Sequence, residues 1–387
     1  MYRKTYAQIN NKVLTNNVKE IISKYNDYNY YFGVVKANAY GHGDYVVNDL
    51  IKGGINYLAV SSLEEAISIR KYNKEISILC LEPISLEYIK EIIENNVTIT
   101  IESKDYVKEL INKKITKQLK AHLKLDTGMS RLGFTNKEEL NESIKLLKDN
   151  KNILLEGIYT HIATSGINDI YYDKQISKFT ELTKDINLKE IPIVHIGRSM
   201  TLVNHPKLSF VNGVRLGICM YGFNNSITPP TGLRKIKRDR LLKKLNISES
   251  TLTNNLDLKT AFSLYTEVMS IRKVAKDSFV GYGANYIAKE DIIVATLPIG
   301  YVDGMNKLMK YVSINDKKYE IIGDICMDMT MIKIDDTIKI HDKVEIFGNN
   351  ISIKEVSRNV NSNAYHVLTS ITTRVPRVYT DNTEIKY

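Results

Sequence analysis

The sequence predicts an α/β protein, in which an amino-terminal (β/α)8 TIM-type barrel precedes a carboxyl-terminal, mostly β domain. Its 387 residues exceed one average domain of about 150 residues and allow two or three domains, or a large barrel with an appendage. Between residues 31 and 219, short β-rich runs alternate with helical stretches, which favours a parallel barrel. From residue 261 onward, short strands with turn signals replace this alternation.

Eight β-rich runs form the predicted barrel. They are Tyr31–Lys36, Tyr57–Ser61, Ser77–Leu81, Val97–Ile101, Lys120–Asp126, Leu154–His161, Pro192–Gly197 and Val214–Cys219. The segments between them carry polar faces with apolar residues at helical spacing. We therefore expect helices over Ser62–Lys71, Leu86–Asn95, Lys137–Asp149 and Tyr171–Lys184.

The predicted domains are a barrel over residues 1–235, an inserted linker region over 236–260 and a β domain over 261–387. The segment Asn224–Asn255 contains a Pro-Pro pair, a basic run and an Asn/Ser/Thr-rich stretch, which indicates a linker or an inserted excursion. In the β domain we expect strands over Leu264–Val274, Ile292–Leu297, Lys310–Ile314, Lys318–Ile322, Thr330–Ile334 and Lys343–Phe347.

The composition is that of an ordinary folded protein. Hydrophobic residues make up 43% of the chain and charged residues 25%, which argues against a disordered, collagenous or coiled-coil chain. The formal net charge of +10 would favour a polyanion if the basic residues were clustered. The one dense basic run, Leu233–Lys244, is more typical of a solvated loop, and we expect no nucleic-acid partner.

The three cysteines, Cys80, Cys219 and Cys326, lie far apart without a Cys-x-x-Cys pair. This spacing excludes a disulfide framework and most zinc sites, and it fits a reducing compartment. The start of the chain lacks the apolar core of a signal peptide, and no stretch reaches the roughly 18 apolar residues of a membrane span. We expect a cytoplasmic protein without a membrane partner.

Reactive groups of a (β/α)8 barrel sit at the carboxyl ends of its strands, so these ends are the first place to look for function. Lys36 ends the first predicted strand, and Ala-Asn-Ala-Tyr-Gly-His-Gly follows it. Desolvation lowers the pKa of a lysine and makes it a nucleophile towards aldehydes, as a Schiff-base lysine requires. The alternative is a lysine that reaches solvent at the barrel rim.

Polar residues also lie at the other strand ends. Taken singly, each is better explained by a satisfied hydrogen bond in the core or at the rim. Taken together, one lysine, several cations and a Gly/Ser-bearing loop suit a phosphorylated aldehyde cofactor. The residues are Lys124, Asp126, Arg131, His161, His195, Arg198, Ser199 and Arg215.

With these motifs the chain resembles the alanine racemases, which are pyridoxal-phosphate enzymes with an amino-terminal barrel and a carboxyl-terminal β domain. The VVKANAYGHG segment is similar to the family's cofactor-attachment motif. KLDTGMSRLGF, RLGICMYG, VGYGANY, LPIGYVDG, DICMDMTM and RVPR follow in family order, so the resemblance spans nearly the whole chain. One GYG alone would be weak, whereas seven ordered motifs are specific.

The resemblance implies roles at the cofactor, pyridoxal 5'-phosphate. Lys36 matches the lysine that binds it covalently and serves as one of two bases. Tyr40 matches a tyrosine that hydrogen-bonds the phosphate, and Ser199 with the backbone of Gly217 and Ile218 matches the rest of the phosphate cradle. Such anion nests need permissive backbone geometry.

Arg215 matches the arginine that faces the pyridine nitrogen, and His195 resembles a residue that orients this arginine. A guanidinium cannot readily lose a proton, so it does not protonate the ring as an acidic partner would. The ring then remains a weaker electron sink, which favours reprotonation at Cα over transamination.

Tyr282, in GYG, matches the second base, on the face of the substrate opposite Lys36. Racemisation needs two such groups, because one face loses a proton while the other gains one. A phenol has an ordinary pKa near 10, so its anion needs support. By resemblance, His161 at the cofactor belongs to a relay from tyrosine to histidine to arginine. From its residue type alone, Tyr282 could equally be a buried packing residue.

Further residues match the substrate site. Arg131 matches an arginine near the substrate carboxylate, and Lys124 matches a lysine that is carbamylated in many members. Tyr301 in LPIGYVDG, with Met327 and Asp328 in CMD, falls among the substrate-binding residues. The resemblance also implies a head-to-tail homodimer with shared active sites, in which the β domain of one subunit reaches the barrel of the other.

Three features depart from the family pattern. Arg198 precedes Ser199 where many members have asparagine, which adds a cation beside the phosphate. Thr373 stands before Arg-Val-Pro-Arg where many members have tyrosine, which leaves room beside the substrate's Cβ. We therefore hypothesise turnover of serine or larger amino acids besides alanine. The third feature is the Asn224–Asn255 excursion, which is longer than most members' link.

Three alternative functions fit parts of the sequence. A fold-related pyridoxal-phosphate decarboxylase would share both domains, but GYGANY, CMD and Arg215 argue against it, since decarboxylation profits from an acidic partner at the pyridine nitrogen. A non-catalytic cofactor-binding protein would leave Tyr282, Met327 and Asp328 without a purpose. Nucleic-acid binding lacks any stripe of interleaved aromatic and basic residues.

Overall fold

The structure is a computed structural model, and it describes residues 3–164, 169–223 and 256–381 together with residues 236, 237, 239, 240, 243, 385 and 386. The chain divides into two compact units. The barrel unit comprises Thr15–Ala37 and Asp44–Leu258, and the β unit comprises Met1–Leu14, Asn38–Gly43 and Lys259–Tyr387. Most of the predicted linker region 236–260 and of the Asn224–Asn255 excursion lies outside the described residues.

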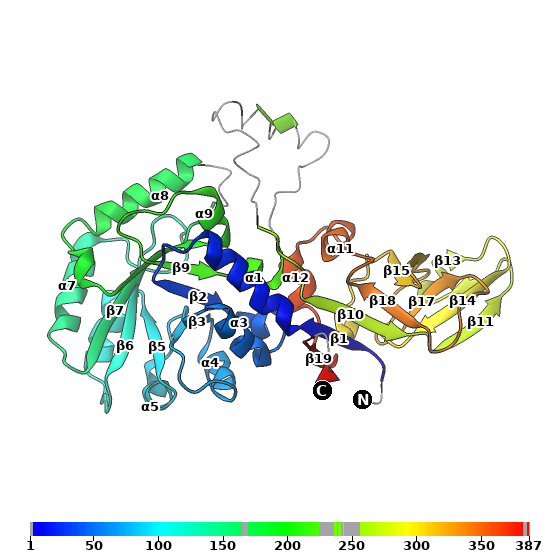
Figure 1. The fold of residues 1–387 in the computed structure, drawn as a ribbon, viewed down its shortest axis with the longest axis horizontal. Helices are drawn as coiled ribbons and strands as arrows, with labels where there is room; N and C mark the ends of the chain where they lie inside the picture. The colour runs from blue at the N-terminus through cyan, green and yellow to red at the C-terminus, as the bar shows by residue number, and fades with distance from the viewer. Residues whose placement is uncertain are drawn as a thin grey trace. The chain divides into compact units, whose positions relative to one another are not determined.

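The barrel unit contains a closed barrel of eight parallel strands, each paired with its neighbours in chain order (Figure 1). The predicted (β/α)8 barrel is confirmed, and every predicted strand overlaps an observed one. The strands are buried on both faces, as the pattern of β5 shows over all five of its residues. They are β2 (Tyr30–Val34), β3 (Tyr57–Val60), β4 (Ile78–Cys80), β5 (Val97–Ile101), β6 (Leu119–Lys124), β7 (Ile153–Tyr159), β8 (Ile193–Arg198) and β9 (Gly213–Leu216).

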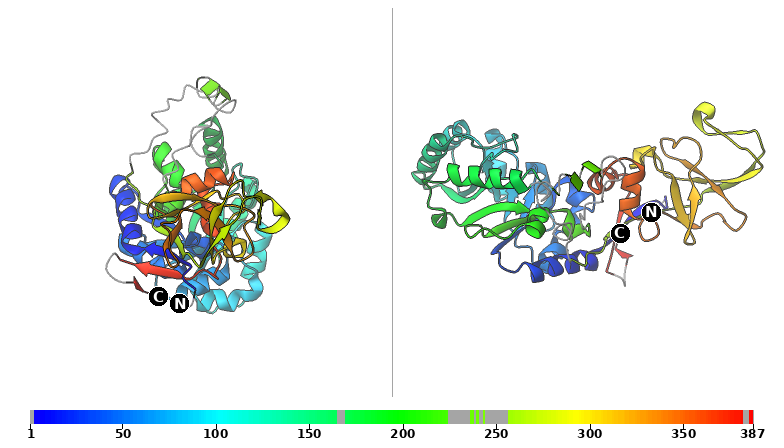
Figure 2. Two further views of the ribbon diagram at one scale, coloured as in Figure 1. Left: turned by 90° about the vertical axis from the view of Figure 1, so that its right-hand side faces the viewer. Right: turned by 90° about the horizontal axis from the view of Figure 1, so that it is seen from above.

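Helices surround these strands, as Figures 1 and 2 show. In α7 the buried residues Leu140, Ser143, Ile144 and Leu147 recur at helical spacing, so one face of the helix packs on the sheet. The helices of this unit are α1 (Asn11–Lys24, which begins in the β unit), α3 (Val47–Gly53), α4 (Leu63–Arg70), α5 (Ile89–Glu94), α6 (Lys104–Ile111), α7 (Lys137–Lys148), α8 (Asp169–Leu182) and α9 (Ser199–Asn204), with the 3-10 turns η1 (Asp44–Val46), η2 (Leu86–Tyr88), η3 (Leu188–Glu190) and η4 (Ile218–Tyr221).

Polar caps set the start of three helices. The side chains of Ser62, Ser103 and Asn136 accept the backbone N–H groups of Glu65, Tyr106 and Glu139, respectively, three residues further on. These bonds satisfy donors that a helix leaves without an intrahelical partner.

The β unit is built on a seven-stranded sheet in the order β16-β15-β18-β10-β1-β19-β20, a three-stranded sheet in the order β11-β14-β17, and the hairpin β12-β13. Its mostly β character is confirmed. The elements are β1 (Tyr6–Asn10), β10 (Phe262–Glu267), β11 (Ser270–Val274), β12 (Phe279–Val280), β13 (Tyr286–Ile287), β14 (Ile292–Leu297), β15 (Tyr311–Ile314), β16 (Lys317–Glu320), β17 (Thr330–Ile334), β18 (Lys343–Phe347), β19 (Arg377–Thr380) and β20 (Ile385–Lys386), with helices α11 (Ile353–Asn359) and α12 (Ala364–Thr369) and the 3-10 turns η6 (Tyr282–Ala284) and η7 (Tyr301–Asp303).

The first strand departs from the predicted barrel of residues 1–235. β1 pairs antiparallel with β10 and parallel with β19, so it belongs to the large sheet of the β unit. Its residues alternate between half-buried and buried, and Ala7 and Ile9 point into the core. The predicted single strand Leu264–Val274 is likewise two strands, β10 and β11, which lie in different sheets.

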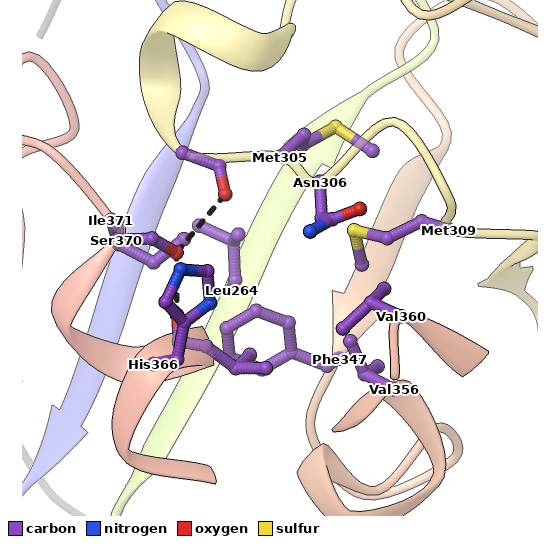
Figure 3. Close-up of a pocket in the computed structure, with 12 residues that line it drawn as sticks. Leu264, Met305, Asn306, Met309, Phe347, Val356, Val360, His366, Ser370 and Ile371 are labelled. Carbon is purple, nitrogen blue, oxygen red and sulfur yellow. Dashed lines mark hydrogen bonds between the residues drawn. The ribbon is translucent and has the colours of Figure 1, made fainter. Parts of the chain in front are cut away.

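A small cavity lies in the β unit between β10, β18 and the two helices α11 and α12 (Figure 3). Its walls are mainly apolar, with Leu264, Met305, Met309 and Phe347 among them. Its volume of about 10 Å³ would hold one water molecule. It is therefore a packing gap. Among the described residues, no helix is long and apolar enough to cross a membrane.

Candidate active site

The first candidate residue, Lys36, lies just beyond its strand. β2 ends at Val34, and Lys36 is the half-buried first residue of the short helix α2 (Lys36–Tyr40). The next four residues, 37–40, all have left-handed backbone angles, with φ between 50° and 54°. Left-handed helix costs about 1–2 kcal/mol per non-glycine residue, so the surrounding structure must hold this turn in place.

Glu65 holds the turn at its start. Its Oε1 accepts the backbone N–H of Ala37 at 2.7 Å, and its Oε2 accepts that of Ser61 at 2.8 Å. One carboxylate thereby ties the chain after Lys36 to the loop after β3. Sequence reasoning missed Glu65, whose only signal was its place in the first turn of a predicted helix.

The rest of the attachment motif belongs to the β unit. Tyr40 is 8% exposed, and its ring centroid lies 5.8 Å from that of Tyr365. The two glycines that follow have positive φ, and a Cβ on Gly41 would lie 2.4 Å from the carbonyl oxygen of Leu368. A side chain has no room there, which explains the GHG that follows Tyr40.

In the barrel unit the desolvated lysine is Lys124, at the end of β6. It is 3% exposed, and its Nζ lies 5.1 Å from the ring centroid of Tyr159. Burial, with the nearby charges of Arg215 and Arg131, lowers the pKa of Lys124 to about 8. About a tenth of this amine is therefore neutral at pH 7.

Asp126 organises the loop that carries Arg131. Its carboxylate accepts the backbone N–H groups of Gly128, Ser130 and Arg131 at 2.7–3.0 Å. Burial raises the pKa of Asp126, but these three bonds outweigh burial and lower it overall. Arg131 itself is exposed at the mouth of the barrel.

His161 lies two residues beyond β7 and is half-buried. Burial and the positive charges of Arg215, Arg198, Lys124 and Arg131 lower the pKa of His161 to about 2. It is therefore neutral at physiological pH, and it marks the point where the four cations come together. Its Nδ1 lies 3.5 Å from Nη2 of Arg215.

Arg215, in β9, is 3% exposed and makes a dense set of hydrogen bonds. Its Nη1 donates to Nδ1 of His195 at 2.6 Å, and its Nη2 donates to the carbonyl oxygens of Thr160 at 2.7 Å and Ile196 at 3.0 Å. Burial lowers the pKa of Arg215 only to about 10, so the guanidinium remains charged. None of its hydrogen bonds within the described residues uses the Nε–H.

Behind His195 lie two residues that sequence reasoning missed, His122 and Glu156. The His122 and His195 rings are joined by a hydrogen bond of 2.9 Å, and His122 Nε2 lies 3.1 Å from Oε2 of Glu156. The alternation of β6 places His122 on the same face as Lys124, which was a usable signal. Glu156 has no such signal, because the β6–β7 register shifts and pairs His122 with Gly157.

Ser199 opens helix α9 next to the start of η4. Its Oγ accepts the backbone N–H of Gly217 and the thiol of Cys219, each at 3.0 Å. Burial raises the pKa of Cys219 to about 11, which keeps it a thiol. Ile218 begins η4, and a first-turn N–H has no intrahelical partner. The Ser199 hydroxyl at the start of α9 and the Ile218 N–H at the start of η4 are therefore two hydrogen-bond donors on neighbouring segments.

The β unit holds the other candidates on exposed turns. Tyr282 is 72% exposed, which excludes the buried packing residue that its type alone allowed. It begins η6 between Gly281 and Gly283, whose φ angles of 80° and 70° suit glycine. Asn285 donates to Asp324 at 3.0 Å, which ties this turn to the loop that precedes Met327.

Tyr301, Met327 and Asp328 are brought together by backbone contacts. The N–H of Tyr301 donates to the carbonyl oxygen of Cys326 at 3.0 Å, and that of Val302 donates to Met327 at 2.9 Å. A Cβ on Gly300 would lie 2.4–2.5 Å from backbone atoms of residues 326–328, so only glycine fits this close approach. All three side chains are exposed beside this contact.

Comparison with known proteins assigns the chain to a family. The family model for the alanine racemase N-terminal domain matches residues 9–225, and that for the C-terminal domain matches residues 261–379. The chain belongs to the alanine racemase family. It is an amino-acid racemase of this family, as its relatives indicate.

Alanine racemases from distant organisms are similar over almost the whole chain. The alanine racemase of Methanococcus maripaludis is 33% identical over 388 residues, covering 97% of this chain and 98% of the relative. Alanine racemase 1 of Bacillus subtilis is 32% identical, covering 99% and 95%. A crystal structure of the alanine racemase from E. faecalis has a TM-score of 0.88 at 29% identity, covering 98% and 99%.

The two positions that we expect to depart from the family pattern, Arg198 and Thr373, have defined surroundings. Arg198, at the end of β8, donates from Nη2 to the carbonyl oxygen of Thr164 at 3.0 Å, and so holds the loop that follows His161. Thr373 is exposed next to Thr372, whose N–H donates to the carbonyl oxygen of Asp303 at 3.1 Å. The carboxylate of Asp303 is itself buried and pairs with Arg3.

Proposed function

We propose that the chain interconverts L- and D-alanine with pyridoxal 5'-phosphate, using Lys36 and Tyr282 as two bases. The observation that carries this proposal is the buried, charged Arg215. Its two Nη groups donate hydrogen bonds to groups of the barrel, and its Nε–H makes none of the hydrogen bonds found among the described residues. A pyridine nitrogen is an acceptor for such a donor. We further propose that the product D-alanine is used for peptidoglycan, as is typical of the family.

The residues present fit the cofactor. The barrel mouth carries Lys124, Arg131, Arg198 and Arg215 around one neutral histidine, which suits a phosphate-bearing anion. The Ser199 hydroxyl and the first N–H of η4 supply donors of the kind that bind phosphate. Lys36 supplies a primary amine for the aldehyde. Gly217 and Ile218 belong to the proposed phosphate site of the barrel unit, and we assign Tyr40 to the phosphate from the family resemblance alone.

The cofactor, when bound, withdraws electrons from the Cα of an attached amino acid and so makes its proton removable. The protein controls the fate of that proton. Arg215 donates a hydrogen bond but keeps its proton, because its pKa of about 10 lies far above physiological pH. His195 holds the guanidinium in place. This arrangement limits how far negative charge spreads from Cα, and it therefore favours return of a proton to the same carbon.

Lys36 and Tyr282 act on opposite faces of Cα. One accepts the proton of the incoming enantiomer, while the other donates a proton to form the mirror image. Lys36 sits on a turn that Glu65 restrains, and Tyr282 stands on an exposed turn between two glycines. Arg131, Tyr301, Met327 and Asp328 bind the substrate, and a carbamate on Lys124 would fix Arg131.

We place Tyr282 in the barrel of a second subunit, in a head-to-tail homodimer. The β unit exposes Phe279 at 62%, Tyr282 at 72% and Ile287 at 50% on one hairpin, and Met327 at 55% on a turn linked to it. Exposed apolar groups so close together are typical of an interaction surface. A monomer would then lack the second base.

An exchange assay tests the proposal. Purified protein, pyridoxal phosphate and L-alanine are incubated in deuterated water, and loss of the Cα proton and formation of D-alanine are followed. We expect Lys36→Ala and Tyr282→Phe to abolish racemisation. Tyr311→Phe, at another exposed tyrosine of the β unit, is the matched control and should retain it. Retained activity in Tyr282→Phe would rule out the tyrosine as the second base.

A second candidate activity rests on Thr373. The exposed threonine is much smaller than the tyrosine of many members, and its hydroxyl can hydrogen-bond a polar side chain. We therefore expect D-serine from L-serine in the same assay, and Thr373→Tyr should reduce the serine rate relative to the alanine rate. No turnover of L-serine or of longer amino acids would limit the enzyme to alanine.

A further inference from the structure

A chain of hydrogen-bonded side chains crosses the interior of the barrel behind Arg215. Arg215 Nη1 lies 2.6 Å from Nδ1 of His195, and Nε2 of His195 lies 2.9 Å from Nδ1 of His122. Nε2 of His122 lies 3.1 Å from Oε2 of Glu156. Both histidines are 0% exposed and Glu156 is 7% exposed, so water does not compete for these bonds.

The chemistry of the two ends fixes the direction of every bond. A guanidinium only donates, so its contact of 2.6 Å requires Nδ1 of His195 to accept and the His195 proton to sit on Nε2. That Nε2–H donates to Nδ1 of His122, which leaves the His122 proton on Nε2. The carboxylate of Glu156 only accepts, and it receives this last proton. Burial keeps both imidazoles neutral by lowering their pKa values.

Packing holds the planes of both rings. The His195 ring stacks between Phe32 and Tyr159, with ring centroids at 4.5 and 4.6 Å. A Cβ on Gly157 would lie 2.4 Å from Nδ1 of His122, so the backbone of β7 lies directly against this ring. The ring planes are therefore held in place, and the hydrogen-bond partners at the two ends set which nitrogen carries each proton.

Glu156 is anchored independently of the histidines. Its Oε2 also accepts the Tyr57 hydroxyl at 2.7 Å, and its Oε1 pairs with Lys120 at 2.8 Å. Burial raises the pKa of Glu156, but the bonds from His122, Lys120 and Tyr57 outweigh burial and lower it to about 2. Glu156 thus offers a permanent acceptor at the far end of the chain.

We infer that Glu156 and His122 are positioning residues for the racemase: they fix the proton of His195 on Nε2, so that Nδ1 can hold the guanidinium of Arg215. Without the acceptor at Glu156, the proton of His122 can move to Nδ1. His195 must then accept at Nε2 and carry its own proton on Nδ1. Two donors would face each other across 2.6 Å, and Arg215 would have to move.

Nitrogen-15 NMR of histidine-labelled protein, saturated with pyridoxal phosphate, tests the assignment directly. In the native protein we expect proton-bearing Nε2 and bare Nδ1 at both His195 and His122. Glu156→Leu removes the acceptor, and we expect it to move the His195 proton to Nδ1. Glu156→Gln keeps an acceptor oxygen and should restore the native pattern. Lys120→Met alters only the contact to Oε1 and is the matched control.

Kinetics supply the second readout, which rests on the proposed function. Losing one hydrogen bond to a charged group should lower kcat about tenfold in Glu156→Leu, with KM for alanine little changed. Glu156→Gln and Lys120→Met should stay near the native kcat. A structural defect would instead lower the fraction of folded protein, which thermal unfolding measures, and would leave the His195 proton on Nε2 in the folded fraction.

Two results would overturn the inference. One is native protein with a proton on Nδ1 of His195, or with a doubly protonated His122, and this needs no variant to fold. The other is an unchanged His195 in folded Glu156→Leu. A third result separates the two proposals. If His195 and His122 carry their protons on Nε2 but the protein racemises no amino acid, the proposed function is refuted, whereas the inference on the position of Arg215 stands.

Discussion

The two units hold their functional groups in opposite ways. In the barrel unit, Lys124 at the end of β6 is buried, as are His195 within β8 and Arg215 within β9, and side-chain hydrogen bonds or ring contacts fix each of them. In the β unit, Tyr282 and Met327 are more than half exposed and stand on turns that backbone contacts and glycines define. The barrel unit therefore controls the charge and the proton positions of buried groups, whereas the β unit presents side chains at its surface.

We expect the largest effect of this difference in the pH dependence of the unfolding free energy, because the buried histidines stay neutral in the folded protein. Burial lowers the pKa values of His122, His161 and His195 in the barrel unit and of His42 in the β unit. Each of these histidines takes up a proton below an ordinary pKa of 6.5 in the unfolded protein, but not in the folded protein. Unfolded protein then binds more protons, so stability falls as pH decreases below 6.5, by up to about 1.4 kcal/mol per pH unit for each histidine.

Denaturant unfolding from pH 7 to pH 5 measures this slope. His161→Gln should make the slope shallower, because its folded pKa of about 2 makes it neutral over the whole range. His341→Gln, at a histidine whose side chain is 77% exposed, is the control. Equal slopes for His161→Gln and native protein would mean that His161 takes up its proton while folded.

The barrel and its strand ends were predictable because eight buried runs repeat one local pattern. The predicted strands Thr330–Ile334 and Lys343–Phe347 also match β17 and β18 at both ends. β1 was not predicted as a strand of the β unit, because its partners β10 and β19 lie more than 250 residues away in the sequence. Pairing over such distances leaves no local signal.

The candidate residues in motifs were predictable, but the residues that hold them were not. Glu65 and Glu156 look like ordinary polar residues in the sequence, and only the fold brings them to the backbone of Ala37 and to His122. The expected desolvated lysine was Lys36, yet the buried lysine of the barrel mouth is Lys124. Burial depends on neighbouring strands, which one strand's pattern does not contain.

Gly300 tests how far backbone contacts alone hold the β-unit site. In Gly300→Ala, the new Cβ would lie 2.4–2.5 Å from backbone atoms of residues 326–328, so the two loops must separate. We expect a loss of about 1–3 kcal/mol in unfolding free energy, and a higher KM for alanine. Gly348→Ala, where a Cβ would meet side-chain atoms of Glu345 and Ser263 at 2.9 Å and not backbone atoms, should cost less. Equal losses would contradict a special role for the backbone contact.

Glu65 tests the corresponding restraint in the barrel unit. Glu65→Ala releases the N–H groups of Ala37 and Ser61 and should lower stability by about 1–2 kcal/mol. Because it frees the turn after Lys36, we also expect slower attachment of pyridoxal phosphate, measured by absorbance. Glu64→Ala, at the exposed neighbouring glutamate, should change both little. Unaltered attachment in Glu65→Ala would show that the left-handed turn is held by other contacts.

Lys124 should give the smallest change in stability and the most specific chemical signal. With a pKa of about 8, roughly a tenth of this lysine is neutral at pH 7 and can add to carbon dioxide. The product is a carbamate, which replaces a buried cation by an anion close to Arg131 and Arg215. Carbon-13 NMR in labelled bicarbonate should show a carbamate signal that Lys124→Met lacks and Lys120→Met keeps. If the signal persists in Lys124→Met, the carbamate lies elsewhere, and Lys124 stays a cation that repels both arginines.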